Sequence, residues 1–233
     1  MEKLKIFCIP YAGGSAVMYY KWKNYFPNDI ELYPVELAGR GKRFGEPYYD
    51  TLLDAVEDVY KQIKNYLDET PYFLFGHSMG SLIAYELYYK LKEQNKQLPC
   101  HIFFSAIKPP HIRKNEAKKY TLPDEEFKEE IIKLGGTKEE LFNNQALVKI
   151  FLPLLKADYR IVEMYQYQSR EEKIECNLTM LGGKEDAKAT AEDLMQWGSY
   201  TKKTSRFYEF EGGHFFIQNQ IEEITRIIKE TSI

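Results

Sequence analysis

Blocks of apolar and polar residues alternate along the first half of the chain and predict helices and strands in turn. Helices are expected where apolar residues recur at three- and four-residue steps, most clearly from Thr51 to Leu67, and also from Ser15 to about Tyr25 and from about Ser81 to Glu93. Short apolar runs predict buried strands at residues 4–10, 30–35, 72–75 and 102–105. This alternation predicts an α/β fold, with a mostly parallel sheet and helices on both of its faces.

The pattern changes at residue 108, and up to about residue 167 helical signals occur without a strand signal. Residues 124–134 predict a charged helix closed by two glycines, and a longer helical stretch contains Pro153. Between them, Thr137 and Glu140 have the spacing of a capping box. Such a block is too helical to be a loop, so we interpret it as an inserted helical lid.

The strand and helix alternation resumes after the insertion. Strands are expected at 178–181 and 205–210, and helices at about 190–197 and 217–230. We therefore expect one α/β core formed by residues 1–107 and 168–233, interrupted by the lid at residues 108–167. A chain of 233 residues with 44% hydrophobic residues is long and apolar enough for one such core.

Charge and hydropathy exclude several classes of partner. The net charge is −3 and acidic and basic residues are interspersed, so no nucleic-acid partner is expected. No apolar stretch approaches the length of a membrane span, and the apolar run near the N-terminus is too short for a signal peptide. We expect a cytoplasmic protein without a membrane partner.

The sequence implies no metal and no cofactor. Three cysteines at wide spacing, Cys8, Cys100 and Cys176, favour buried thiols in or beside the sheet over disulfides or a zinc site. No glycine-rich phosphate loop and no cluster of metal ligands occurs along the chain.

A candidate nucleophile lies in the sequence Gly-His-Ser-Met-Gly at residues 76–80. An apolar strand precedes this G-x-S-x-G pattern and a helix follows at once, which is the context of a nucleophile elbow. The sharp turn strains the backbone of Ser78, brings Gly76 and Gly80 too close together for a Cβ, and leaves the serine hydroxyl exposed above the sheet. The alternative to a nucleophile elbow is an ordinary glycine-rich turn in which the serine only caps the helix. We predict that Ser78 is the nucleophile and that His77 points elsewhere.

A serine hydroxyl needs a base, and His214 is the best placed of the four histidines. It follows the predicted last strand and two glycines, where a serine α/β-hydrolase has its base, in the chain order Ser, acid, His. The acid should follow the strand before that one, which favours Asp186 over Glu185, the nearest competitor, and over Asp193. Its role would be to orient the imidazole and stabilise the imidazolium.

An oxyanion hole requires two backbone N–H donors. One is expected from Met79, the residue after the nucleophile, and the other from the glycine-containing loop after the first strand. In that loop we nominate Ala12, with Gly13 as a possible neighbour.

Together these motifs resemble those of type II thioesterases, the free-standing editing enzymes of nonribosomal peptide and polyketide synthesis. The resemblance covers nearly the whole chain, in the stretches Pro10 to Ser15, Gly39 to Gly41 with Arg43 and Glu46–Pro47, Phe75 to Gly80, Leu134 to Thr137, Leu152–Pro153, Ala157 to Tyr159, Gly182–Gly183 with Asp186, and Gly212 to Phe216. One departure is Ala38, where the family often has proline before Gly-Arg-Gly.

The resemblance implies an α/β-hydrolase that removes acyl or aminoacyl groups from the phosphopantetheine arm of carrier proteins, with a mobile lid over the acyl channel. An acyl-loaded carrier protein is then the expected partner, and we expect a monomer. Ser78, Asp186 and His214 match the family's triad, and Ala12 and Met79 match its oxyanion donors. Asp158, in a matching lid stretch, is interpreted as structural.

Two other functions stay open on the residues alone. A triad does not distinguish a thioester from an oxygen ester, so a carboxylesterase or acyltransferase on the same fold is an alternative. A module that docks on carrier proteins without catalysis is a more remote one.

Overall fold

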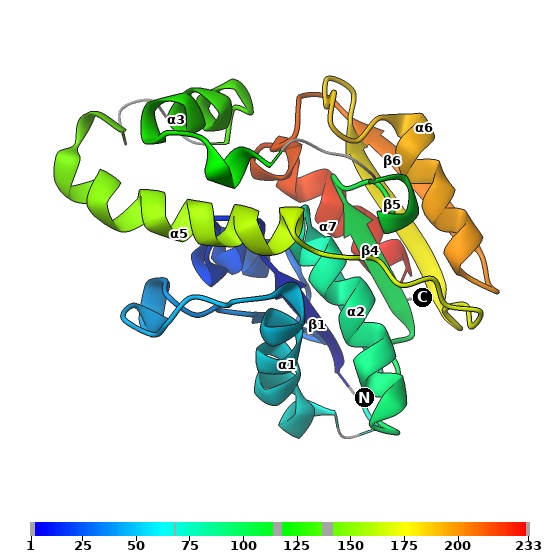
Figure 1. The fold of residues 1–233 in the computed structure, drawn as a ribbon. Helices are drawn as coiled ribbons and strands as arrows, with labels where there is room; N and C mark the ends of the chain where they lie inside the picture. Colours follow the sequence, from blue (N-terminus) through cyan, green and yellow to red (C-terminus); the bar gives the residue numbers. More distant parts are fainter. Residues whose placement is uncertain (1–2, 68, 114–117, 137–141, 232–233) are drawn as a thin grey trace.

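The computed structural model describes residues 3–67, 69–113, 118–136 and 142–231. Its described residues form one six-stranded sheet with the order β2-β1-β3-β4-β5-β6, in which all neighbouring strands are parallel (Figure 1). The strands are β1 (Leu4–Ile9), β2 (Ile30–Pro34), β3 (Tyr72–His77), β4 (His101–Ser105), β5 (Asn177–Gly183) and β6 (Ser205–Phe210). The predicted parallel sheet is confirmed, and each expected strand agrees with the observed one within two residues at either end.

Helices cover both faces of the sheet, as predicted. One face is covered by α1 (Leu52–Ile63), α2 (Met79–Glu93) and α6 (Ala191–Met195), and the other by η1 (Ala16–Tyr25) and α7 (Ile221–Thr231). The helix expected from Ser15 is a 3-10 helix capped by the Ser15 hydroxyl. Short 3-10 turns follow α1 (η3, Lys64–Tyr66) and α6 (η6, Gln196–Tyr200), so each of these α-helices ends earlier than the sequence pattern predicts.

Each strand sends alternate side chains into two apolar cores. In β1, Phe7 and Ile9 face α1 and α2, whereas Ile6 and Cys8 face η1 and α7. All four side chains are at most 1% exposed, because helices cover both faces of the parallel sheet. This two-sided burial explains why β1 appears in the sequence as a continuous apolar run.

The chain leaves the sheet between β4 and β5. Here it forms the short 3-10 turns η4 (Pro110–Ile112) and η5 (Lys119–Thr121), then α3 (Asp124–Lys133) and α5 (Gln145–Glu163), and the described part of 108–167 contains no strand. The two α-helices share a small apolar core around Phe127, Ile131, Leu152 and Leu155. The C-terminal end of α5 lies over the start of α2 (Figure 1). The capping box expected at Thr137 and Glu140 lies outside the described residues.

The strand order reverses at β1, which lies between β2 and β3. Loops that leave the carboxyl ends of β1 and β3 therefore diverge to opposite sides, and such a switch point is where open α/β sheets bind ligands. The loop after β1 carries Ala12, and the turn after β3 carries Ser78. Within the described ranges, no helix is long and apolar enough to cross a membrane.

Candidate active site

Ser78 occupies a strained turn between β3 and α2. Its φ of 52° and ψ of −116° lie outside the regions that a residue with a Cβ prefers. A Cβ on Gly76 would come within 2.3 Å of the Gly80 carbonyl oxygen, and one on Gly80 would come within 2.1 Å of the Ile9 carbonyl oxygen. The two glycines thus permit the close approach of α2 to β1 and β3 that raises the serine hydroxyl above the sheet.

The structure brings Ser78, His214 and Asp186 together at the carboxyl edge of the sheet. His214 Nδ1 lies 2.7 Å from Asp186 Oδ2, and His214 Nε2 lies 3.0 Å from Ser78 Oγ. Because an ionised carboxylate only accepts hydrogen bonds, Nδ1 carries the ring proton of a neutral imidazole and Nε2 accepts from the serine hydroxyl. His214 and Asp186 are 9% and 5% exposed, so this hydrogen-bonded chain is largely shielded from water.

Asp186 is itself held in position. Its backbone N–H donates to the Gly183 carbonyl at 3.1 Å, and its Oδ1 accepts from the backbone N–H of Lys188 at 2.9 Å. Glu185 is exposed, and Asp193 forms a capping box with Thr190 at the start of α6. The geometry therefore favours Asp186 over both competing acids.

His77 points away from the serine, as expected. Its ring is fully buried and hydrogen-bonds Ser105 Oγ at 2.7 Å and the backbone carbonyl oxygen of His214 at 3.0 Å. Burial lowers its pKa well below the usual value, and the neighbouring His214 lowers it further. His77 is therefore a neutral residue of the supporting structure.

In the loop after β1, hydrogen bonding distinguishes Ala12 from Gly13 as a possible oxyanion donor. Gly13 N–H donates to Asp158 Oδ2 at 2.7 Å, which takes this group out of the site. Ala12 N–H has no hydrogen-bond partner within the part of the chain that the structure describes. Met79 is the first residue of α2, where a backbone N–H has no partner inside the helix. Ala12 and Met79 line the same pocket as Ser78.

That pocket lies between the triad and the inserted segment. Tyr159, Val162 and Glu163 of α5 line it together with Ser78 and His214. Burial raises the pKa of Glu163, whose Oε2 accepts from the backbone N–H of Tyr120 at 3.0 Å. Three cations, Lys108, Arg113 and Lys188, also line the pocket. The described residues contain no group of three or more His, Cys, Asp or Glu side chains arranged to hold a metal ion.

Sequence reasoning assigned no role to Arg40, although it lies in a Gly-Arg-Gly stretch that the resemblance singled out. Arg40 Nη1 and Nη2 each lie 2.7 Å from an oxygen of the Asp158 carboxylate, and the Arg40 and Asp158 residues are 4% and 2% exposed. The expectation that Asp158 is structural agrees with these contacts. An arginine between two glycines is a visible feature of the sequence, but it does not identify Asp158 as the partner, because that residue lies 118 residues away.

Comparison with known proteins gives matches along almost the whole chain. A family model described as thioesterase domain matches residues 4–231. The gramicidin S biosynthesis protein GrsT of Aneurinibacillus migulanus is 36% identical over 229 residues, which cover 98% of this chain and 89% of that protein. The medium-chain S-acyl fatty acid synthase thioesterase of Anas platyrhynchos is 30% identical over 239 residues, covering 98% of this chain and 94% of that protein.

A solved structure extends the similarity to three dimensions. The crystal structure of ClbQ from the colibactin NRPS/PKS pathway matches with a TM-score of 0.94 at 37% identity, covering 99% of this chain and 97% of that chain. The expected α/β-hydrolase fold is thereby confirmed.

Proposed function

Since this chain belongs to the thioesterase family, we propose that it removes acyl or aminoacyl groups from the phosphopantetheine arm of carrier proteins in nonribosomal peptide or polyketide synthesis. Family membership makes the chain an enzyme that hydrolyses thioesters. The carrier-protein substrate is supported by similar proteins whose names place them in gramicidin S and colibactin biosynthesis. We extend the proposal to a monomer that acts in the cytoplasm.

The observation that carries the proposed chemistry is the hydrogen-bonded chain from Ser78 through His214 to Asp186 at a pocket. Ser78 Oγ attacks the thioester carbonyl carbon while its proton passes to His214 Nε2. The negative charge that develops on the carbonyl oxygen is stabilised by the N–H groups of Ala12 and Met79. Asp186 stabilises the imidazolium throughout.

The tetrahedral intermediate then collapses with cleavage of the carbon–sulfur bond, and the thiol leaves with the proton from His214. A thiol has a pKa near 8.5, so its departure requires little help from a general acid. A water molecule then gives a proton to His214 and attacks the acyl-Ser78 ester. Collapse of the second intermediate releases the carboxylic acid and returns the proton to Ser78 Oγ.

We propose that residues 108–167 act as a mobile lid over the acyl channel. The C-terminal half of α5 supports this role, because Tyr159, Val162 and Glu163 line the pocket that contains Ser78.

A panel of acyl-loaded carrier proteins, tested beside the same acyl groups on coenzyme A and as simple oxygen esters, tests the proposal. We expect the highest kcat/KM on carrier-bound thioesters and no turnover by Ser78→Ala, with the fold verified by circular dichroism. Preference for oxygen esters would favour the carboxylesterase alternative. Unchanged turnover in Ser78→Ala would refute the catalytic assignment, and carrier binding without turnover by the unmodified protein would favour the docking module.

A further inference from the structure

A buried ion pair connects the inserted segment to the loop that carries Ala12. Asp158 of α5 receives three contacts of 2.7 Å, one from Gly13 N–H and one from each Nη of Arg40. Arg40 in turn donates from Nη1 to the Gly14 carbonyl oxygen at 3.2 Å. The loop is thus held at two successive residues, through the N–H of Gly13 and the C=O of Gly14.

These contacts decide which N–H groups can face the substrate. Gly13 has a φ of 76°, and a Cβ added there would lie 2.5 Å from Leu155 Cδ2, so α5 packs directly against the loop. With the Gly13 N–H bound to Asp158, the neighbouring Ala12 N–H is the group of this loop that remains available at the pocket.

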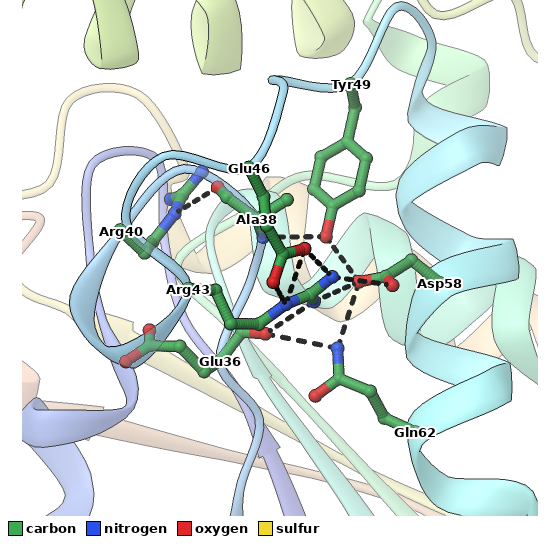
Figure 2. Close-up of polar contacts among 8 residues, drawn as sticks. All are labelled: Glu36, Ala38, Arg40, Arg43, Glu46, Tyr49, Asp58 and Gln62. Atoms are coloured by element: carbon green, nitrogen blue, oxygen red, sulfur yellow. Dashed lines mark hydrogen bonds and ion pairs between the residues drawn. The ribbon is translucent and has the colours of Figure 1, made fainter.

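The loop that supplies Arg40 is anchored on its other side (Figure 2). Arg43 Nη2 donates to Asp58 Oδ1 of α1 at 3.0 Å, and Tyr49 OH accepts from Ala38 N–H at 2.9 Å while it donates to Asp58. Arg40 Nε donates to the Ala38 carbonyl oxygen at 3.2 Å. Arg40 therefore approaches Asp158 from a fixed backbone.

We propose that Asp158, together with Arg40, is a positioning residue for the oxyanion hole, and that it sets the orientation of the Ala12 N–H through the Gly13–Gly14 backbone. The inference rests on the proposed function of Ala12. A buried ion pair often contributes little to stability compared with apolar residues of similar volume. Loss of one oxyanion donor, in contrast, lowers turnover by about 10²–10³-fold. The pair should therefore matter more for kcat than for folding.

The test uses two variants. One is Asp158→Asn. The other is an apolar double variant that combines Asp158→Leu and Arg40→Met and so leaves no unpaired buried charge. The matched control is Lys156→Gln, also on α5, whose ion pair with Asp124 at 2.6 Å stays within the inserted segment. Turnover of an acyl-pantetheine thioester is measured beside inhibition by an acyl trifluoromethyl ketone. Ser78 adds to this ketone to form an oxyanion adduct, with the serine proton on His214, so the inhibition constant reports on the hole directly.

We expect the double variant to lose about 10²-fold in kcat, by analogy with a lost oxyanion donor, with little change in KM and an equal rise in the inhibition constant. Asp158→Asn, which keeps an acceptor for Gly13 N–H, should lose less, and Lys156→Gln should behave as the unmodified protein. A folded double variant with unchanged kcat, or a kcat loss without weaker ketone inhibition, would overturn the inference. Should the double variant fail to fold, Asp158→Asn decides: a lower kcat with equally weakened ketone inhibition supports the inference, and an unchanged kcat overturns it. If instead the proposed function is wrong, the unmodified protein itself will not hydrolyse thioesters, which distinguishes this result from a failure of the inference about Asp158.

Discussion

The ring of His77 donates a hydrogen bond from Nε2 to the backbone carbonyl oxygen of His214, across 3.0 Å. A carbonyl oxygen can only accept, so Nε2 carries the proton and Nδ1 accepts from Ser105 Oγ at 2.7 Å. The residue beside the proposed nucleophile thereby holds the backbone of the proposed base. Two segments that are 137 residues apart in the chain are joined by one neutral imidazole.

Replacing His77 should therefore affect both stability and turnover. His77→Asn removes the Nε2 donor and leaves a buried carbonyl oxygen without it, which should cost about 1–3 kcal/mol of unfolding free energy. Because a misplacement of 1 Å can cost about 10²-fold, kcat should fall by about 10- to 100-fold. Urea unfolding and thioester turnover measure the two effects. His77→Gln, whose amide nitrogen can reach the Nε2 position, should be closer to the unmodified protein in both stability and turnover. If both variants had normal stability and turnover, the proposed role of His77 in holding the His214 backbone would be contradicted.

Acid should weaken the fold through buried histidines. Burial, with a contribution from Arg206, lowers the pKa of His101 to about 4, and its Nε2 lies 2.9 Å from Thr179 Oγ1. The unfolded chain takes up this proton near pH 6.5 and the folded chain only near pH 4, so unfolding free energy falls as the pH drops through that window. The slope from one such histidine is about 1.4 kcal/mol per pH unit.

Urea unfolding at intervals between pH 7.5 and 4.5 measures this dependence. His77, whose pKa is lowered in the same direction, should add to the slope. His101→Gln should remove the contribution of His101, so its curve should be flatter than that of the unmodified protein. Parallel curves for the two proteins would show that His101 is not kept neutral by the fold.

The two neighbouring acids at the end of β5 offer a matched pair of substitutions. Asp186→Asn keeps the size of the side chain but removes the carboxylate that fixes the His214 tautomer, and kcat should fall by about 10⁴-fold. Glu185→Gln, at an exposed position, should leave turnover unchanged. Steady-state kinetics on one acyl-pantetheine substrate compare the two. A larger loss in Glu185→Gln than in Asp186→Asn would reverse the assignment of the acid.

Gly80 should tolerate no side chain, because the obstacle is backbone. A Cβ there would lie 2.1 Å from the Ile9 carbonyl oxygen, so Gly80→Ala must push α2 away from β1 and should destabilise the fold by about 1–3 kcal/mol or more. Turnover should fall as well, since Ser78 directly precedes the first residue of the same helix. For comparison, the nearest atom to a Cβ on Gly198 is the hydroxyl of Ser205 at 2.8 Å, a side-chain end that can rotate away. Chemical denaturation should therefore find Gly198→Ala less affected, and the opposite ranking would count against the close-approach argument.

Local patterns were sufficient to predict most of the architecture. Strand and helix order, the elbow at Ser78 and the loop positions of Asp186 and His214 follow from apolar runs that end at glycines, because a parallel sheet collects its loops at one edge. The sequence favours Ala12 over Gly13, but the structural basis for this choice could not be derived from local patterns. It depends on Asp158, which is 145 residues from Gly13 and meets it only through the packing of α5. The same non-local packing explains why Arg40 received no role from its sequence context.

One helix, α5, both lines the pocket at Ser78 and binds the loop after β1 through Asp158. Asp158 accepts the hydrogen bond from Gly13, whereas the next residue, Tyr159, lines the pocket, as do Val162 and Glu163 one turn later. If Asp158 positions the oxyanion hole as proposed, substitutions that reshape the α5 side of the pocket to change chain-length selectivity will also change the catalytic rate, because any rotation or shift of the helix moves the Asp158 carboxylate.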